Sequence, residues 1–345
     1  MNNYQDFIYA LNQARSAEEP ILEVCITDTD GSSYRKSGAR MLIDAHGMMT
    51  GLVTGGCLEG ELSAIAPGLL SHQKHQVLEY DMRTIDPNQC VFGPGCNGRV
   101  RVRINCLSPQ NGYGALAHIA EQFPNKATLL SAIDESGDYA IKQGASFFAT
   151  DNMPTNAQDI IAQATETPEL VTINGKEFLL EIVTPAKRLT LLGASSDARL
   201  LANMAQPLGF YVQLLDDREA YIKEGQAMGL KVSSFANAAF DVGESDAIVV
   251  MSHDYDKDID AIKLIQTANA PYIGMLGPAD RRDRVLKSAN LSVEFFGGRL
   301  YGPAGLDIGA DSSDQIVVSI LAEMLAVLNN RSADSLRNKT QSIHA

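Results

Sequence analysis

Two neighbouring segments near the N-terminus combine residue types that suit an anionic ligand with affinity for sulfur. The first, Gly31-Ser-Ser-Tyr-Arg-Lys-Ser-Gly-Ala-Arg-Met41, is rich in cations and small side chains. The second, Gly51-Leu-Val-Thr-Gly-Gly-Cys-Leu-Glu59, places a cysteine after two glycines, where a helix is expected to begin. Glycines let backbone N–H groups approach an anion closely, and a helix N-terminus stabilises a thiolate. Together the segments predict one binding site.

The candidate site residues of these segments are Gly55, Gly56, Cys57, Glu59, Arg35, Lys36 and Arg40. Cys57 is the candidate metal ligand, and Cys96, also beside glycines, is the secondary sulfur ligand. The plain alternative is that both cysteines are small buried thiols and that Glu59 only serves the helix dipole. Because no C-x-x-C pattern occurs, a structural zinc site is not expected.

A row of arginines follows in the same part of the chain. Arg99, Arg101 and Arg103 alternate along one expected strand, so all three should project from one face. Such a row is usually a solvated face. Together with the cations of the first segment, it could instead line an anion pocket in an acidic protein.

The second half of the chain carries an incomplete dinucleotide-binding pattern. Gly193-x-Ser195-x-x-Ala198 follows an apolar strand and opens a helix, and Asp216 ends the next strand. In that context phosphate binds the helix N-terminus and the carboxylate binds ribose hydroxyls. Ser195 replaces the middle glycine, and its Cβ would crowd a pyrophosphate. Either a dinucleotide binds here or the fold is kept without one, and we expect weak or absent NAD(P) binding.

A further candidate is His253, which closes another apolar strand of this half. Ligands of doubly wound sheets bind beyond the carboxyl ends of the strands, so a functional imidazole is plausible at this point. The alternative is a structural histidine.

The elements that must position the first group of residues form a mixed α+β domain over residues 1–186. The patterns predict helices over 6–16, 57–71, 114–122 and 156–165, and strands over 21–29, 39–44, 48–53, 76–82, 98–107, 127–133, 139–148 and 177–183.

The pattern changes near residue 186 to strand–helix–strand alternation, which predicts a Rossmann-like, doubly wound parallel sheet over 187–330. Apolar runs over 189–192, 211–215, 246–251 and 271–276 are its expected strands. A last helix should begin near Ser312 or Ser313, both good N-caps. Residues 331–345 are polar and are expected to form a mobile tail. The fold class is therefore α/β, with a mixed first domain.

Composition limits the class of protein. The chain has 345 residues, a formal charge of −14 and five cysteines. The charge argues against a general nucleic-acid binder, and the odd cysteine count fits a reducing cytoplasm better than a disulfide framework. No apolar run is long enough to span a bilayer, and the N-terminus does not read as a secretory signal. We therefore expect a cytoplasmic protein that binds neither nucleic acid nor membrane.

A series of short motifs runs in a specific order through nearly the whole chain. The motifs are Gly31 to Met41, Gly55-Gly-Cys-Leu-Glu59, Gly95-Cys-Asn-Gly98, Leu192-Gly-Ala194 with Asp216-Asp-Arg218, Ser252-His-Asp254, Tyr272-Ile-Gly-Met-Leu-Gly277, and Gly302-Pro-Ala-Gly-Leu-Asp-Ile-Gly309 with Ser319-Ile-Leu-Ala-Glu323. In them the chain resembles the xanthine dehydrogenase accessory (XdhC/CoxI) family of molybdenum hydroxylase maturation factors. The departures are Tyr34 for a frequent proline, Asn97 for a glycine, and Ser195-Ser196 for a frequent Gly-His.

The resemblance implies a non-catalytic accessory protein that binds the molybdenum cofactor, a molybdopterin phosphate with a dithiolene-bound metal. It implies delivery of that cofactor to an apo molybdenum hydroxylase, a homodimer, and contact with sulfur-supplying machinery such as a cysteine desulfurase. A thiolate suits the molybdenum–sulfur centre, and cations with glycine N–H groups suit the phosphate. Two alternatives stay open, namely an NAD(P)-dependent oxidoreductase and a nucleotide-sensing regulator.

Overall fold

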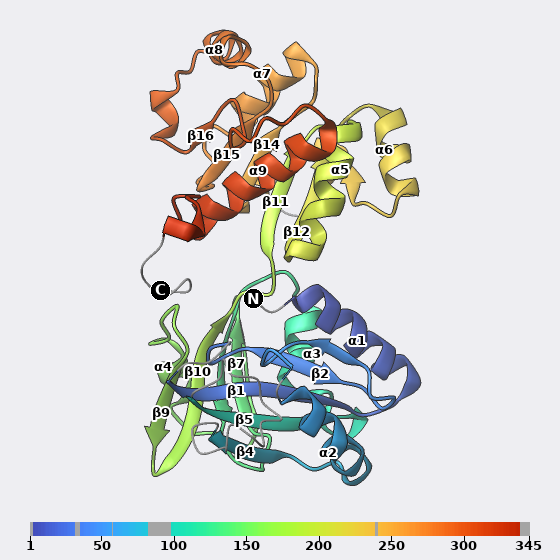
Figure 1. Cartoon of the computed structure of the whole chain (residues 1–345), viewed down its shortest axis with the longest axis vertical. Helices are drawn as coiled ribbons and strands as arrows, with labels where there is room; N and C mark the ends of the chain where they lie inside the picture. The colour runs from blue at the N-terminus through green and yellow to red at the C-terminus, as the bar shows by residue number, and fades with distance from the viewer. Residues whose placement is uncertain (1–2, 32–34, 57, 82–97, 239–240, 339–345) are drawn as a thin grey trace. The chain divides into compact units, whose positions relative to one another are not determined.

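The computed structural model describes residues 3–31, 35–56, 58–81, 98–238 and 241–338. The chain divides into two compact units, residues 1–186 (unit 1) and 187–345 (unit 2), and Figure 1 shows the elements of each. Each unit has its own sheets and its own apolar core, so each is described by itself.

Unit 1 contains two five-stranded antiparallel sheets. The first sheet has the order β3 (Met49–Gly51), β2 (Arg40–Ile43), β1 (Ile21–Gly31), β5 (Gly98–Leu107), β4 (Gln76–Asp81). The second sheet has the order β8 (Ser146–Ala149), β7 (Tyr139–Gln143), β6 (Ala127–Ala132), β10 (Lys176–Val183), β9 (Glu169–Ile173). Its helices are α1 (Tyr4–Ala17), α2 (Glu59–His72), α3 (Gly114–Glu121) and α4 (Ala157–Ile161).

The structure of unit 1 differs from the prediction at two points. The expected strand over 139–148 is a hairpin of β7 and β8, because Gly144 adopts φ +58° in a tight turn. The pattern also missed β9, whose residues are mostly exposed and therefore lack a clear apolar alternation.

Successive side chains of β1 point to opposite faces of the first sheet, and the two faces are covered by different elements. Leu22, Val24 and Ile26 pack with residues of α2 in one core cluster. Glu23 and Cys25 lie between them in sequence and therefore project to the opposite face, where Cys25 contacts Leu179 of the second sheet. One face of the first sheet is thus apolar and helix-covered, and the other packs on the second sheet.

The layer between the two sheets is charged rather than apolar at its centre. Arg40 is 1% exposed, and its Nε donates to Glu23 Oε1 at 3.0 Å. Its two terminal nitrogens donate to Glu181 of β10, with Nη1 to Oε2 at 2.9 Å. Arg40 therefore joins the first sheet to the second, and its guanidinium is occupied by two buried carboxylates.

The arginine row of β5 belongs to the same layer. Arg101 donates to Glu177 of β10 at 2.7 Å, and Arg103 lies 3.5 Å from Glu23. Arg99 is also paired, with carboxylates of β1 and β4. The prediction of one shared face is correct. The row is neither a solvated face nor an open anion pocket, because each arginine is paired with a carboxylate of the sheets themselves.

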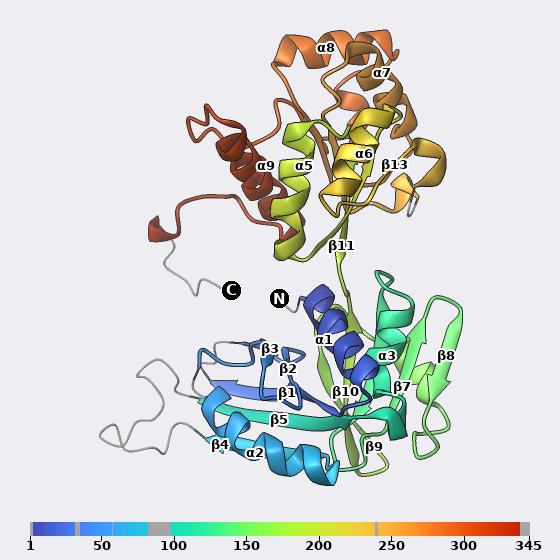
Figure 2. The same cartoon turned by 90° about the vertical axis from the view of Figure 1, so that its right-hand side faces the viewer.

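Unit 2 is a six-stranded sheet in which every pair of strands is parallel. Its order is β13 (Val232–Ser233), β12 (Phe210–Leu215), β11 (Lys187–Leu192), β14 (Ala247–Val250), β15 (Tyr272–Met275), β16 (Leu300–Tyr301). Helices cover both faces, as Figures 1 and 2 show. They are α5 (Ser196–Ala205), α6 (Glu219–Ala227), α7 (Tyr255–Leu264), α8 (Ala279–Ser288) and α9 (Ser313–Leu328).

The prediction of a Rossmann-like parallel sheet is confirmed, and Ser312 is the N-cap of α9. The strand order is the one typical of dinucleotide-binding domains. The sequence pattern missed the two edge strands, β13 and β16, because two residues are too few to show a periodicity.

We predict that Arg40→Met destabilises the protein by about 3–5 kcal/mol, because it leaves two buried carboxylates without a counter-charge. Arg101→Met is the matched control. Its partner Glu177 is 45% exposed, so water can replace the lost contact and the cost should be at most about 1 kcal/mol. Urea unfolding followed by circular dichroism measures both. Equal destabilisation by the two variants would contradict the buried-pair explanation.

Candidate functional site

The turn before α2 is held by a carboxylate from the first residue of the helix. Glu59 Oε1 accepts hydrogen bonds from the backbone N–H groups of Val53, at 3.3 Å, and Thr54, at 2.8 Å. Its Oε2 accepts from the Thr54 hydroxyl, whose oxygen in turn accepts from Leu58 N at 3.1 Å. Thr54 and Glu59 thus tie the two ends of the Gly-Gly-Cys turn together. We call this pair the turn latch.

The environment of Glu59 favours its charged form. Burial raises the pKa of this carboxyl, but the hydrogen bonds from Thr54 and from the backbone N–H groups of Val53 and Glu59 together lower it by more, so the pKa lies below its ordinary value. The sequence suggested a ligand contact or a helix-dipole role for Glu59. Its contacts in the structure are with the turn.

The glycines of this turn lie at the surface. Gly55 and Gly56 are exposed, and Gly56 has φ +104° with open space where a Cβ would be. No side chain caps the N-terminus of α2, since Leu58 holds the N-cap position. An exposed glycine turn before an uncapped helix suits an anion. Cys57 and Cys96 lie outside the described residues.

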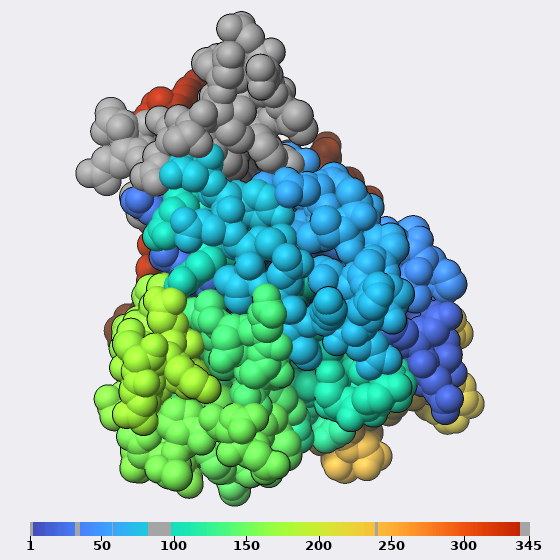
Figure 3. Space-filling model, turned by 90° about the horizontal axis from the view of Figure 1, so that it is seen from below, coloured from blue at the N-terminus to red at the C-terminus, as the bar shows by residue number. Residues whose placement is uncertain are grey.

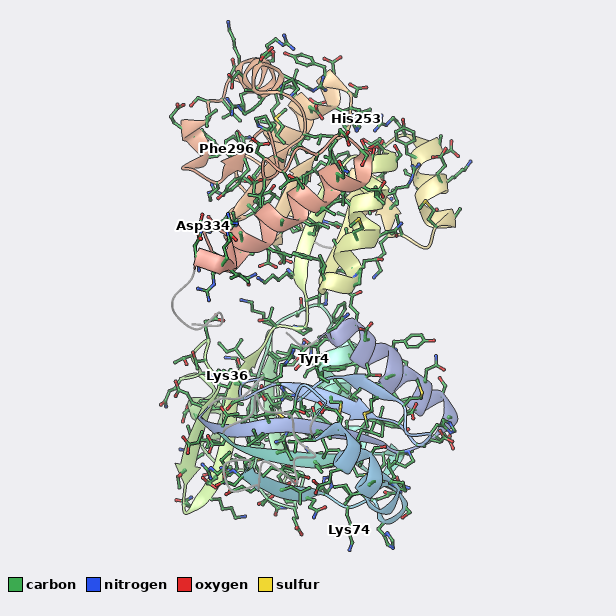
Figure 4. All side chains as sticks on the ribbon, viewed as in Figure 1. Tyr4, Lys36, Lys74, His253, Phe296 and Asp334 are labelled. Atoms are coloured by element: carbon green, nitrogen blue, oxygen red, sulfur yellow. The ribbon has the colours of Figure 1, made fainter. Side chains whose placement is uncertain are left out.

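The three cations of the first segment are separated by the fold. Lys36 is exposed (Figure 4), and Arg35 is half-buried. Arg40 lies in the layer between the sheets, and its Nη1 donates a hydrogen bond to Gly38 O at 3.0 Å. Gly38 has φ +83°, and a Cβ there would stand 3.1 Å from Glu181 Oε2. Arg40 therefore anchors the loop that carries Lys36.

In unit 2, the backbone of residues 251–252 packs directly against the glycine-containing turn after β11. Gly193 has φ +123°, and a Cβ there would lie 2.7 Å from Met251 O. This glycine is required by the segment that follows strand β14 rather than by a ligand. Ser195 is the N-cap of α5 and accepts from Ala198 N at 3.4 Å.

Asp216 is engaged by its own neighbours. Its Oδ2 accepts from Ala194 N at 2.9 Å, and its Oδ1 accepts from Arg218 Nε at 2.8 Å. Burial raises the pKa of this carboxyl, but the hydrogen bonds from Arg218 and Ala194 lower it by more, so its charged form is favoured. Arg218 also stacks over Tyr221, at 4.1 Å from the ring centroid. The carboxylate expected to bind ribose is therefore paired with Arg218, which the sequence analysis quoted in a motif but did not choose as a site residue.

His253 lies at the same edge of the sheet and has φ +58°, which is rare for a residue other than glycine. Its Nε2 lies 3.3 Å from Asp197 Oδ2, and Ser313 donates to the other oxygen of Asp197 at 2.8 Å. The imidazole is about half exposed (Figure 4). The structure thus brings the ends of β11, β12 and β14 together at one edge, as the sequence predicted.

Two motifs far apart in the sequence meet in the same unit. Glu323 Oε2 of α9 accepts from Gly305 N and from the Tyr272 hydroxyl, each at 2.8 Å. Gly305 has φ +111°, and a Cβ there would collide with Ser319 Oγ. These contacts fix the loop over 302–306 on α9.

The cysteines that the structure describes do not suit ligand binding. Cys25 and Cys106 are buried, and burial raises the pKa of Cys25 to about 12 and that of Cys106 to about 11. Within the described ranges, no three His, Cys, Asp or Glu side chains are grouped as metal ligands would be. Over the same part of the chain, no helix is long and apolar enough to cross a membrane.

Comparison with known proteins gives two family matches. Residues 14–81 match the XdhC and CoxI family, and residues 189–324 match the XdhC Rossmann domain. The first match contains the turn latch, and the second contains the edge of the parallel sheet described above.

Relatives match over most of the chain. A protein of Bacillus subtilis described as a probable xanthine dehydrogenase component is 30% identical over 94% of this chain and 97% of its own length. The molybdenum cofactor insertion chaperone PaoD of Escherichia coli is 20% identical over 95% of this chain and 89% of its own. A solved structure from Bacillus halodurans, described as a xanthine dehydrogenase, has a TM-score of 0.75 over 97% of this chain and 98% of its own at 24% identity, which shows the shared fold.

We predict that calorimetry with NAD or NADP detects no binding in the micromolar range. Ala194 N–H, which would face a pyrophosphate, donates to Asp216, and Asp216 is paired with Arg218. A dissociation constant at or below the micromolar range would favour the oxidoreductase alternative.

A second prediction concerns the turn latch. Glu59→Gln should cost about 1–3 kcal/mol at neutral pH, because an amide cannot accept all the latch bonds. Since the folded pKa of Glu59 is depressed below 4.5, its contribution is present above that value and is lost as the pH falls through the folded pKa. Thermal unfolding against pH measures this. Glu61→Gln, an exposed change on the same helix, should leave the profile unchanged. If Glu59→Gln loses stability on acidification as much as the parent does, the turn latch is not the cause of that acid sensitivity.

Proposed function

The chain belongs to the XdhC and CoxI family, and from this premise we propose that it is a maturation factor for a molybdenum hydroxylase. In this proposal it binds the molybdenum cofactor as cargo, catalyses no turnover reaction and passes the cofactor to an apo-enzyme. The name of the PaoD relative, which aligns over nearly the whole of both chains, supports this cargo. The B. subtilis relative supports xanthine dehydrogenase as the class of client.

The observation that carries the proposal is the exposed glycine turn closed by Thr54 and Glu59 at the uncapped N-terminus of α2. A thiolate borne by this turn gains stability from the helix N-terminus. We assign Cys57 as the principal sulfur ligand of the molybdenum and Cys96 as the secondary one. A thiolate is a suitable ligand for such a soft metal–sulfur centre.

The phosphate of the cargo is assigned to cations and backbone N–H groups. Lys36 and Arg35 are proposed to bind it, together with the N–H groups of Gly55 and Gly56. Arg40 contributes by holding the loop that carries them, because its guanidinium is already bonded to Glu23 and Glu181.

At the edge of the sheet in unit 2, the proposed contacts to the cargo come from Ser195 and His253. Gly193 and Asp216 contribute by shaping the turn between them. The strand order favours a nucleotide ligand as the alternative function, either as oxidoreductase cofactor or as regulator. The Asp216–Arg218 pair opposes it.

The proposed partners follow from the cargo. They are the apo-hydroxylase, a cysteine desulfurase that supplies sulfur, and a second copy of this chain in a homodimer. The proposed location is the cytoplasm, where thiols stay reduced.

We predict that Cys57→Ala abolishes retention of the molybdenum cofactor while leaving the circular dichroism spectrum unchanged. Metal analysis combined with mass spectrometry of the released pterin measures retention. Cys106→Ala is the matched control, since it also removes one thiol but a buried one, and it should retain the cofactor. Cofactor retention by Cys57→Ala at the parent's level would refute the assignment.

A further inference from the structure

The open edge of the second sheet in unit 1 carries features that neither the fold nor the proposed cargo site uses. β8 is the terminal strand of this sheet, as Figure 2 shows, and it pairs only with β7 among the strands that the structure describes. It contains two consecutive phenylalanines, Phe147 and Phe148, which are 39% and 41% exposed. Large apolar side chains on an unprotected edge strand are unusual, because such edges readily pair with another chain.

The hydrogen-bond register shows which backbone groups face outward. Thr150 N donates to Tyr139 O, so Thr150 bonds to β7. Bonding alternates along an antiparallel strand, so Phe148 and Ser146 also bond to β7, opposite Ile141 and Gln143. Phe147 and Ala149 therefore direct their N–H and C=O groups to the open edge. These groups are a template for one more strand.

The two sides of this edge differ in chemistry. On the α3 side, Phe148 lies against His118 and Tyr139, with ring centroids 4.7 and 5.6 Å away. On the α4 side, Phe147 is the cross-strand neighbour of Lys142, which is opposite Thr128. One side is aromatic and the other combines an exposed ring with a cation.

Beside Lys142 the surface is hollowed. The hollow has a volume of about 300 Å³ and is lined by Lys126, Thr128, Lys142, Ile161, Ala162 and Ala164. Neither lysine forms an ion pair with another residue that the structure describes. Figure 3 shows the surface of β7, β8 and α4 in green beside that of β9 and β10. Two available ammonium groups beside a mostly polar hollow suit carboxylates.

We propose that β8 docks an extended, acidic segment of a partner protein as an added strand. The outward groups of Phe147 and Ala149 would pair with its backbone, and Lys126 and Lys142 would attract its carboxylates. A second copy of this chain would bring the same lysines, so charge favours a different, acidic partner. The proposal does not depend on cofactor binding.

The test uses the full chain and two synthetic peptides, acetyl-Glu-Val-Glu-Val-Glu-amide and its counterpart with lysine in place of glutamate. We expect the acidic peptide to shift and protect the amides of Phe147 and Ala149 in NMR spectra and to bind more tightly than the basic one. The double variant Lys126→Glu with Lys142→Glu should weaken binding of the acidic peptide about tenfold. Lys176→Glu, at the start of β10, should not.

A matched pair of variants tests backbone pairing separately from the ring. Phe147→Thr keeps the outward N–H group and should retain peptide binding. Phe147→Pro lacks that N–H group and should abolish peptide binding. Circular dichroism checks that both variants are folded. Equal binding of the acidic and basic peptides would overturn the proposal. So would unchanged NMR signals of Phe147 and Ala149 at millimolar concentrations of the acidic peptide. Protection of these amides in the free protein that grows with its concentration would overturn it too, because a second copy would then occupy the edge.

Discussion

The buried guanidinium of Arg40 is the contact on which the arrangement of unit 1 depends. A charge inside a protein is tolerated only when a counter-charge and hydrogen bonds surround it. Glu23 supplies one carboxylate from the same sheet, and Glu181 supplies another from the opposite sheet. The two sheets must therefore stack with these strands in place, or Glu181 loses its counter-charge and Arg40 keeps only Glu23. Since Gly38 also bonds to Arg40, the same contact sets the loop that carries Lys36.

Unit 2 shows the same use of charge at its sheet edge. Asp216 is paired with Arg218 and bonded to Ala194, and Glu323 holds Gly305 and Tyr272. These carboxylates stand at or beside a sheet edge that binds ligands in related folds, yet they serve loop geometry. At this edge the half-exposed imidazole of His253 lies beside these engaged carboxylates.

Sequence reasoning predicted the elements better than the pairings. Apolar alternation places β1 and β5 well, because each strand has one continuously apolar face in the core cluster with α2. It merges β7 with β8, where only Gly144 signals the turn. The Arg40–Glu181 pair joins residues 141 positions apart, and no spacing rule reaches that far. Glu59 with Thr54 is a local pair, five residues apart, so a search for hydroxyl–carboxylate turns could have found the turn latch.

The division between arginine and lysine follows from their chemistry. Arginine presents a rigid fork that binds carboxylates in two places, which suits buried or inter-sheet pairs such as those of Arg40 and Arg101. Lysine keeps a hydrated point charge on a flexible stem, and Lys36, Lys126 and Lys142 are all exposed. In a chain of charge −14, positive potential at the surface of unit 1 therefore depends largely on lysines and backbone N–H groups. An anion at either proposed site of this unit would consequently be attracted by groups that can adjust to it, while Arg40 and Arg101 keep the two sheets in register.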